Sequence, residues 1–186
     1  MIEPLFISVW PVLFMSLIYG GGMKLRRQRI DMEGEPPIDK NLFLSSKLAM
    51  IIPWALMIFQ SFGVNVSMVK GPGLLRPISL VLWASGFALA IVGRIGLGNS
   101  FRVGRPKEST RLRVDGLYRF SRNPMYLGLY ATLAASALYA RQPVGWLAAA
   151  FVVAVHHRIV LAEEENLRDA FGDEYRDYCR RVRRYL

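Results

Sequence analysis

The sequence has few of the residues that disulfides, metal sites and familiar hydrolase or nucleotide motifs require. Cys179 is the single cysteine among 186 residues, so no disulfide can form within the chain. The two histidines, His156 and His157, are adjacent and would point in different directions from a helix, and no third ligand follows at the spacing of a zinc site. The patterns G-x-x-x-x-G-K-[ST] and G-x-S-x-G are missing as well. We therefore expect no bound metal and no P-loop or serine-hydrolase chemistry.

Acidic residues are also scarce, with 14 Asp and Glu against 24 Lys and Arg, which gives a net charge of +10. The basic residues are concentrated in three segments, residues 24–47, 102–122 and 158–184, which hold six, seven and seven of them. If the apolar stretches between them cross a membrane in order, all three segments lie on one side, as the positive-inside rule predicts for the cytosol. The charge thus favours membrane topology and contact with anionic lipids over nucleic-acid binding.

Apolar residues are plentiful, at 53% of the chain. A membrane-spanning helix needs about 20 of them in succession. The first two apolar stretches are long enough alone, the third needs Arg94 to reach that length, and the last two are separated only by Arg141 and predict a tight helical hairpin. The stretches are Pro4–Gly22, Leu48–Val69, Pro77–Gly93, Pro124–Ala140 and Gln142–Val155. The sequence therefore predicts an all-α polytopic membrane protein with about five transmembrane helices.

We expect one integral membrane domain, residues 1–186, with two differing halves. Residues 1–93 predict a scaffold of hydrophobic helices, beginning with a retained helix rather than a cleaved signal peptide. Residues 94–186 contain a polar loop of about thirty residues, which is unusually long for a connection in a compact domain and is typical of a functional segment. A cytosolic amphipathic helix follows the hairpin, and Gly172 is expected to break it. The N-terminus would face out and the C-terminus the cytosol.

The tripeptide Arg122-Asn123-Pro124 has the features of a helix start, because asparagine is a favoured N-cap and proline a favoured first helical residue. The free N–H groups and positive dipole end of such a helix suit a carboxylate or phosphate. Arg119 and Arg122 add positive charge, and Tyr126 on the first turn can reach the same place. The alternative is a capped helix whose arginines bind lipid phosphates.

Three adjacent carboxylates, Glu163-Glu164-Glu165, follow the last apolar stretch. They form either a solvated turn of a continuing helix or a site in which one or two glutamates turn inward toward a cation. An amino-acid zwitterion would match an anion-binding helix start beside such glutamates. Arg94 and Arg158 lie near the same expected membrane boundary, where an arginine either extends to the interface or lines a site.

Three blocks carry a family resemblance: "LGNSF" at Leu97–Phe101, "DGLYRFSRNPMYLG" at Asp115–Gly128 and "EEENLRDAFGDEYRDYCRRVRRYL" at Glu163–Leu186. In order and spacing they resemble the C-terminal half of the isoprenylcysteine carboxyl methyltransferases and their relatives, the phospholipid N-methyltransferases. The resemblance covers the chain from Arg94 onward, and the first three helices match only as hydrophobic spans.

The resemblance implies an integral membrane methyltransferase that uses S-adenosylmethionine in a cytosol-facing pocket, with a lipophilic acceptor entering from the bilayer. It implies catalytic roles for Arg158 and Glu164 and acceptor binding by Arg94 and Arg158. Cofactor contacts are implied for a larger set, namely Leu97, Gly98, Tyr118, Arg122, Asn123, Tyr126, Gly128, Glu163 and Glu164.

Two positions depart from the family pattern. The common R-H-P is R-N-P here, so we assign Asn123 to binding rather than to proton transfer. An arginine of the carboxyl methyltransferases is replaced by Ile159, and Arg158 lies one position away, about 100° around a helix. A prenylcysteine carboxylate is the acceptor that the resemblance favours most, and a phospholipid amine, a small thiol and an isoprenoid are the alternatives.

Two other functions are open at this stage. Membrane sterol reductases share a related C-terminal pattern and use NADPH, and a non-enzymatic membrane scaffold would bind neither cofactor. The excess of arginine over lysine, 19 to 5, favours a GC-rich genome and hence a bacterial or archaeal cytoplasmic membrane.

Overall fold

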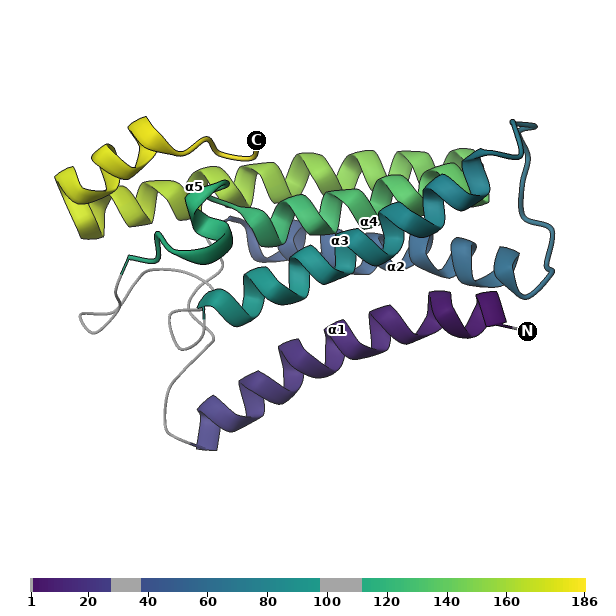
Figure 1. Ribbon diagram of the computed structural model, residues 1–186, viewed down its shortest axis with the longest axis horizontal. Coiled ribbons are helices and arrows are strands. Elements are labelled where there is room, and N and C mark those ends of the chain that lie inside the picture. Colours follow the sequence, from purple (N-terminus) through teal and green to yellow (C-terminus); the bar gives the residue numbers. More distant parts are fainter. Residues whose placement is uncertain (1, 28–37, 98–111) are drawn as a thin grey trace.

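The computed structural model describes residues 2–27, 38–97 and 112–186, and in these ranges every regular element is a helix (Figure 1). Residues 98–111 of the predicted polar loop lie outside them. The elements are α1 (Ile2–Arg27), α2 (Lys40–Ser61), α3 (Leu75–Leu97), the short 3-10 helix η2 (Gly116–Arg119), α4 (Pro124–Ala140) and α5 (Pro143–Arg181). The predicted all-α fold is confirmed.

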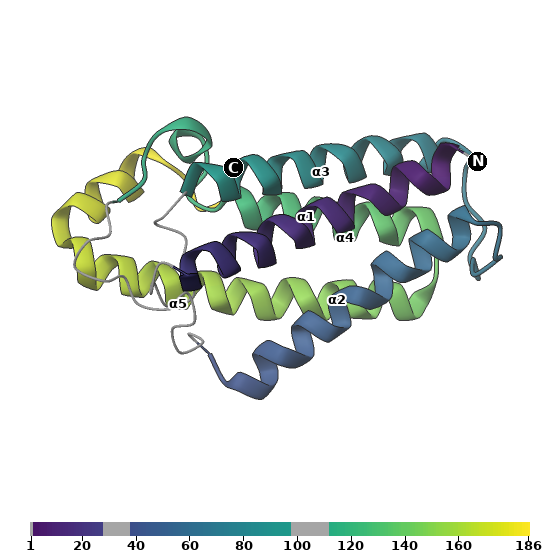
Figure 2. The ribbon, with the colours of Figure 1, turned by 90° about the horizontal axis from the view of Figure 1, so that it is seen from below.

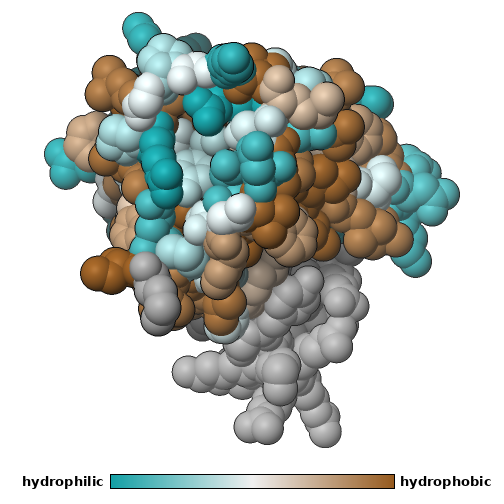
Figure 3. All heavy atoms as spheres, turned by 90° about the vertical axis from the view of Figure 1, so that its right-hand side faces the viewer, coloured by the Kyte–Doolittle hydropathy of each residue, from teal (hydrophilic) through white to brown (hydrophobic). Residues whose placement is uncertain are grey.

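Three of these helices, α2, α3 and α5, are long and apolar enough to cross a membrane, and α1 is apolar over Ile2–Ile18. As predicted, α3 includes Arg94, although the helix begins at Leu75 and is long enough before it reaches that residue. Large hydrophobic side chains such as Val81 and Leu147 are exposed on the outside of the bundle, and hydrophobic residues reach the surface over broad areas in Figure 3. Such surface is disfavoured in water and favoured in lipid. The chain is a polytopic membrane protein.

The long helices alternate in direction, so the start of α4 lies at the same end of the bundle as the last residues of α3 (Figures 1 and 2). We call this the site end, and the end that holds the N-terminus the far end. Helices α3 and α4 approach most closely at Gly86 and Gly128. A Cβ added at Gly128 would lie 2.5 Å from the Gly86 carbonyl oxygen and 2.6 Å from the Ala90 nitrogen. Only glycine permits this contact, which is common between membrane helices.

Aromatic side chains join the helices in the middle of the bundle. Trp83 and Phe87 of α3 are buried against Trp54 of α2, with ring centroids 4.8 to 6.0 Å apart. The indole nitrogen of Trp54 donates to Thr132 Oγ1 of α4 at 3.2 Å, and that of Trp83 donates to the Ile7 carbonyl of α1 at 3.1 Å. The indole bonds thus satisfy their polar atoms while the rings fill the core.

The predicted hairpin between the last two apolar stretches is confirmed. Helix α4 ends at Ala140 and α5 begins at Pro143, with Arg141 in the left-handed conformation (φ 48°). The Arg141 carbonyl accepts hydrogen bonds from the backbone nitrogens of Met68 and Val69, both at 3.2 Å. The hairpin turn is therefore attached to the connection between α2 and α3.

Helix α5 continues past the predicted membrane boundary and bends at Gly172, whose φ of 52° and ψ of −121° are not helical. Glycine adopts this conformation without the steric cost of a Cβ. The predicted break is confirmed, and the chain beyond it folds back along α5 (Figure 1). Tyr175, Tyr178 and Val182 are buried in a small cluster with Leu112.

Candidate functional site

The start of α4 forms the first part of the site. Asn123 precedes Pro124 with non-helical φ of −132°, as predicted for an N-cap, but its side chain makes no capping hydrogen bond. Its Nδ2 instead donates to Glu164 Oε1 at 3.0 Å and to the Arg184 carbonyl at 3.2 Å. A carboxylate is a strong acceptor, so these bonds direct the amide toward Glu164 and the end of the sequence.

Glu164 lies at the centre of the site, with only 4% of its side chain exposed. Arg122 Nη2 donates to Glu164 Oε2 at 3.2 Å, and Arg184 donates to the same oxygen through Nε at 3.1 Å and Nη2 at 3.0 Å. The hydrogen bond with Glu164 raises the pKa of Arg184. Two guanidinium groups share one carboxylate, so these three side chains carry one excess positive charge.

Glu163 has different partners. The Tyr126 hydroxyl donates to both carboxylate oxygens of Glu163, at 3.1 and 3.0 Å, and the Tyr126 ring packs edge-on against His156. Glu165 faces outward and pairs with Arg168. Of the two alternatives for the glutamate triplet, the structure therefore supports the inward one for Glu163 and Glu164 and the exposed one for Glu165.

The last residues of the sequence, Val182–Leu186, complete this side of the cluster, and we call them the tail. The Arg122 backbone nitrogen donates to the Arg183 carbonyl at 2.9 Å, and Ser121 Oγ donates to the Arg184 carbonyl at 3.3 Å. Our sequence analysis missed Arg184 and Tyr185, because the basic tail gave no local signal and its position depends on the reversal at Gly172.

Tyr118 connects η2 to the neighbouring helices. Its hydroxyl donates to the Gly93 carbonyl at 3.2 Å, and its own carbonyl accepts from the Tyr178 hydroxyl at 2.6 Å. Burial raises the pKa of Tyr118, which keeps the hydroxyl protonated as a donor. Arg94, beside Gly93, is buried at the same end of α3. The predicted residues Tyr118 and Arg94 thus lie at the site end.

Four other predicted site residues are not part of this cluster. Arg158 is exposed, while its neighbour Ile159 is fully buried. Gly128 packs against α3, and that contact alone accounts for a glycine there. Leu97 is the last residue of α3, and Gly98 falls outside the described residues. Their proposed cofactor and acceptor contacts stay predictions.

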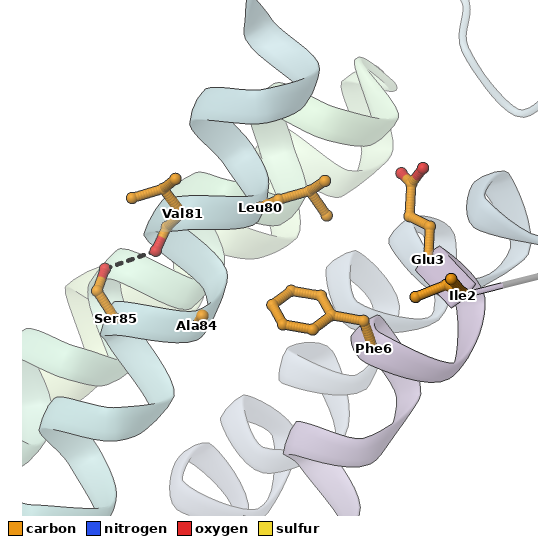
Figure 4. A pocket seen from close by; sticks show the side chains of 7 residues that line it. All are labelled: Ile2, Glu3, Phe6, Leu80, Val81, Ala84 and Ser85. Carbon is orange, nitrogen blue, oxygen red and sulfur yellow. Dashed lines mark hydrogen bonds between the residues drawn. The ribbon is translucent and has the colours of Figure 1, made fainter.

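A groove lies at the far end, between α1 and α3 (Figure 4). Ile2, Phe6 and Leu80 are among its lining residues, and Glu3 and Ser85 are the polar ones. The Ser85 hydroxyl donates to a carbonyl of its own helix, Val81, at 2.8 Å. Most of its lining is apolar, and Glu3 already pairs with Arg76, so this groove is a poor place for polar chemistry.

Comparison with known proteins identifies the family of this chain. The phospholipid methyltransferase family model matches residues 75–174, more than half of the chain, including Arg122, Asn123, Glu163 and Glu164. The chain is also 37% identical over 81 residues to methanethiol S-methyltransferase 1 of Bradyrhizobium diazoefficiens. That match covers 43% of this chain and 27% of the relative, so the chain spans about a quarter of that protein's length.

A second relative, an uncharacterized protein of Haemophilus influenzae, is 40% identical over 63 residues, which is 33% of this chain and the whole of the relative. The extent of the family match decides the assignment. The chain belongs to the phospholipid methyltransferase family.

Proposed function

We propose that this protein is an S-adenosylmethionine-dependent methyltransferase that acts on a lipophilic acceptor at the membrane interface. The observation that carries the proposal is the meeting of two acids and two bases at one end of the bundle, in a chain of a methyltransferase family. The methionine end of the donor carries one ammonium and one carboxylate, and a site with both signs of charge can bind both.

Arg122 and Glu163 fit the amino-acid end of S-adenosylmethionine. Arg122 has only 11% of its side chain exposed, and its Nε is buried without a hydrogen-bond partner among the described residues. A buried N–H without an acceptor is costly, so this atom favours a ligand carboxylate. Glu163 is bound by the neutral hydroxyl of Tyr126. Its negative charge is therefore suited to an ammonium group.

When bound, S-adenosylmethionine supplies a methyl group on a positively charged sulfur. The protein's own contribution is positioning, because transfer in a fixed geometry avoids much of the entropic cost of a bimolecular reaction. Tyr126 orients the Glu163 carboxylate, and Asn123 together with Arg122 orients that of Glu164. The burial of Glu164 keeps water from this side of the site and strengthens its charge interactions.

For the acceptor we propose a molecule that partitions into the bilayer, since the helices around the site expose apolar side chains to lipid. Arg158, which the sequence resemblance assigns to an acceptor carboxylate, is exposed and separate from the charged cluster. A prenylcysteine acceptor therefore gains no added support. A small thiol is the second candidate, favoured by the 37% identity to a methanethiol S-methyltransferase.

Calorimetry in detergent tests the proposal. We expect the wild-type protein to bind S-adenosylmethionine and Glu163→Gln to bind it at least about tenfold more weakly, because a charged contact is lost. Glu165→Gln removes the same charge from an exposed neighbour and is the matched control. Failure of the wild type to bind the donor would contradict the proposal, and binding of NADPH instead would indicate a reductase.

The acceptor is identified separately. Purified protein is incubated with S-adenosylmethionine and either methanethiol or a lipid extract, and products are screened for a mass gain of one methyl group. A methylated lipid supports the first candidate, and methylation of the thiol alone supports the second.

A further inference from the structure

The tail lies against the site through contacts on both sides of Arg184. Upstream, the Arg183 carbonyl accepts from the Arg122 backbone nitrogen at 2.9 Å. Downstream, the Tyr185 hydroxyl lies 2.8 Å from His157 Nδ1 of α5 and 3.5 Å from the Tyr130 hydroxyl of α4. Arg184 is thus held between two attached neighbours, although it lies beyond the residues that the family model matches.

The guanidinium of Arg184 is only partly used by the protein. Its Nε and Nη2 both bond to Glu164, which leaves Nη1 outside this contact, and 35% of the side chain is exposed. The Arg122 guanidinium beside it has a buried Nε without an acceptor among the described residues. Glu164 therefore leaves N–H groups of both arginines unused. A carboxylate of a ligand would take these remaining N–H groups.

We propose that Arg184 is a donor-binding residue, which together with Arg122 forms a two-arginine site for the carboxylate of S-adenosylmethionine. This inference rests on the proposed function. Glu164 then holds the two guanidinium groups side by side, and it is Glu163 that faces the ammonium. Arginine suits this role because its planar fork matches a carboxylate.

Tyr185 is a positioning residue that acts through Arg184. Its ring lies between those of Tyr130 and His157, with centroids 5.6 and 5.9 Å away, and its hydroxyl contacts both. These contacts fix the tail on α4 and α5 at the residue that follows Arg184. Loosening them lets the Arg184 side chain leave Glu164.

The test compares two ligands that differ in the part of the donor that Arg184 would bind. S-adenosylhomocysteine carries the amino-acid carboxylate, and 5′-methylthioadenosine lacks the whole amino-acid end. We expect Arg184→Gln to weaken S-adenosylhomocysteine binding about tenfold, the loss of a charged hydrogen bond, and 5′-methylthioadenosine binding less than about twofold. The inference would be overturned if Arg184→Gln weakened the binding of both ligands equally, or if it weakened the binding of neither.

Arg183→Gln is the matched control, because it removes the same charge from the adjacent, exposed tail residue. We expect it to bind both ligands as the wild type does, and a loss equal to that of Arg184→Gln would overturn the inference. Arg184→Lys keeps the charge without the planar fork and covers the case in which Arg184→Gln does not fold. It should bind S-adenosylhomocysteine more weakly than the wild type and 5′-methylthioadenosine normally.

A double-mutant cycle tests Tyr185. Tyr185→Ala should weaken S-adenosylhomocysteine binding about threefold in the wild type and have no further effect in Arg184→Gln, because coupled residues are not additive. If the losses of affinity caused by the two substitutions multiply in the double variant, Tyr185 does not act through Arg184. If the wild type binds neither ligand, the proposed function itself is wrong. If the wild type binds both ligands and Arg184→Gln binds them equally well, only the proposed role of Arg184 is wrong.

Discussion

Both ends of the bundle contain a glutamate bound by arginine and by a neutral donor, yet they differ in charge and burial. At the far end, Arg76 donates to the two oxygens of Glu3 at 2.9 and 2.7 Å, and the Tyr139 hydroxyl donates to Glu3 at 2.5 Å. At the site end, Glu164 is bound by Arg122, by a second arginine and by an asparagine amide.

The far-end pair is balanced and open to its surroundings, with 61% of the Arg76 side chain and 27% of the Glu3 side chain exposed. At the site end two arginines share the carboxylate of Glu164, of which only 4% is exposed, and 11% of the Arg122 side chain is exposed. A balanced, exposed pair is suited to joining α1 and α3, whereas burying charged groups is costly unless they are paired and hydrogen-bonded. Burial, and the sharing of one carboxylate by two arginines, therefore distinguish the site end from the far-end pair.

The largest effect is expected from Glu164→Gln, which leaves Arg122 and Arg184 close together without their carboxylate. Removing one partner from a buried ion pair costs roughly 3 kcal/mol of stability, and we expect donor binding to fall about a hundredfold. Thermal unfolding in detergent and calorimetry measure the two losses. The exposed neighbour substitution Glu165→Gln is the control, and a similar loss in both variants would contradict the central position of Glu164.

Gly128→Ala tests whether close packing of α3 and α4 supports the site end. The added methyl would meet the Gly86 carbonyl oxygen at 2.5 Å. Overpacking of this kind costs about 2 kcal/mol of stability, measured by thermal unfolding. Gly96→Ala is the control, because its Cβ would lie 3.6 Å from the Tyr118 ring, an ordinary contact. Normal stability of Gly128→Ala would show that the helices can separate freely.

Asn123→Asp is expected to have an intermediate effect. It keeps the shape of the side chain but replaces the N–H donor with an anion next to Glu164 Oε1. Repulsion between the two carboxylates should weaken donor binding about tenfold, more than the loss of one hydrogen bond in Asn123→Ala. Calorimetry compares the donor affinities of the two variants. Weaker binding by Asn123→Ala than by Asn123→Asp would show that Asn123 acts only through its size.

The smallest effect is expected from Glu3→Gln at the far end. An exposed ion pair contributes at most about 1 kcal/mol, so thermal stability should fall slightly and donor affinity should not change. Thermal unfolding in detergent measures the stability, and calorimetry measures the donor affinity. A change in donor affinity would contradict the conclusion that Glu3 and the far end have no part in donor binding.

Several parts of the fold were predictable because their signals are local. Asn123-Pro124 predicted the start of α4, and the single charge at Arg141 predicted the hairpin. Gly172 predicted a break because few other residues adopt its backbone conformation. Glycine, proline and apolar run length act within a few residues, so the sequence shows them directly.

The contacts within the site were less predictable because they join distant parts of the chain. Asn123 was expected to cap its own helix, but its side chain makes no capping bond, and its Nδ2 donates to Glu164, 41 residues away. Arg184 reaches Glu164 only because the chain reverses at Gly172. The glutamate triplet left two alternatives, since the rotation of α5 that turns Glu163 and Glu164 inward is set by its packing against α2 and α4.

The hairpin turn of α4 and α5 has a mechanical consequence for the opposite end of the molecule. The Arg141 carbonyl accepts the two hydrogen bonds described above. In addition, Ser67 Oγ donates to the Ala140 carbonyl at 2.8 Å, and Arg141 Nη1 donates to the Gly71 carbonyl at 3.3 Å. Each of these four bonds has a backbone carbonyl as its acceptor, whereas side chains accept most of the described bonds around Glu164. Separation of these helices would therefore be easier at the site end than at the turn that contains Arg141.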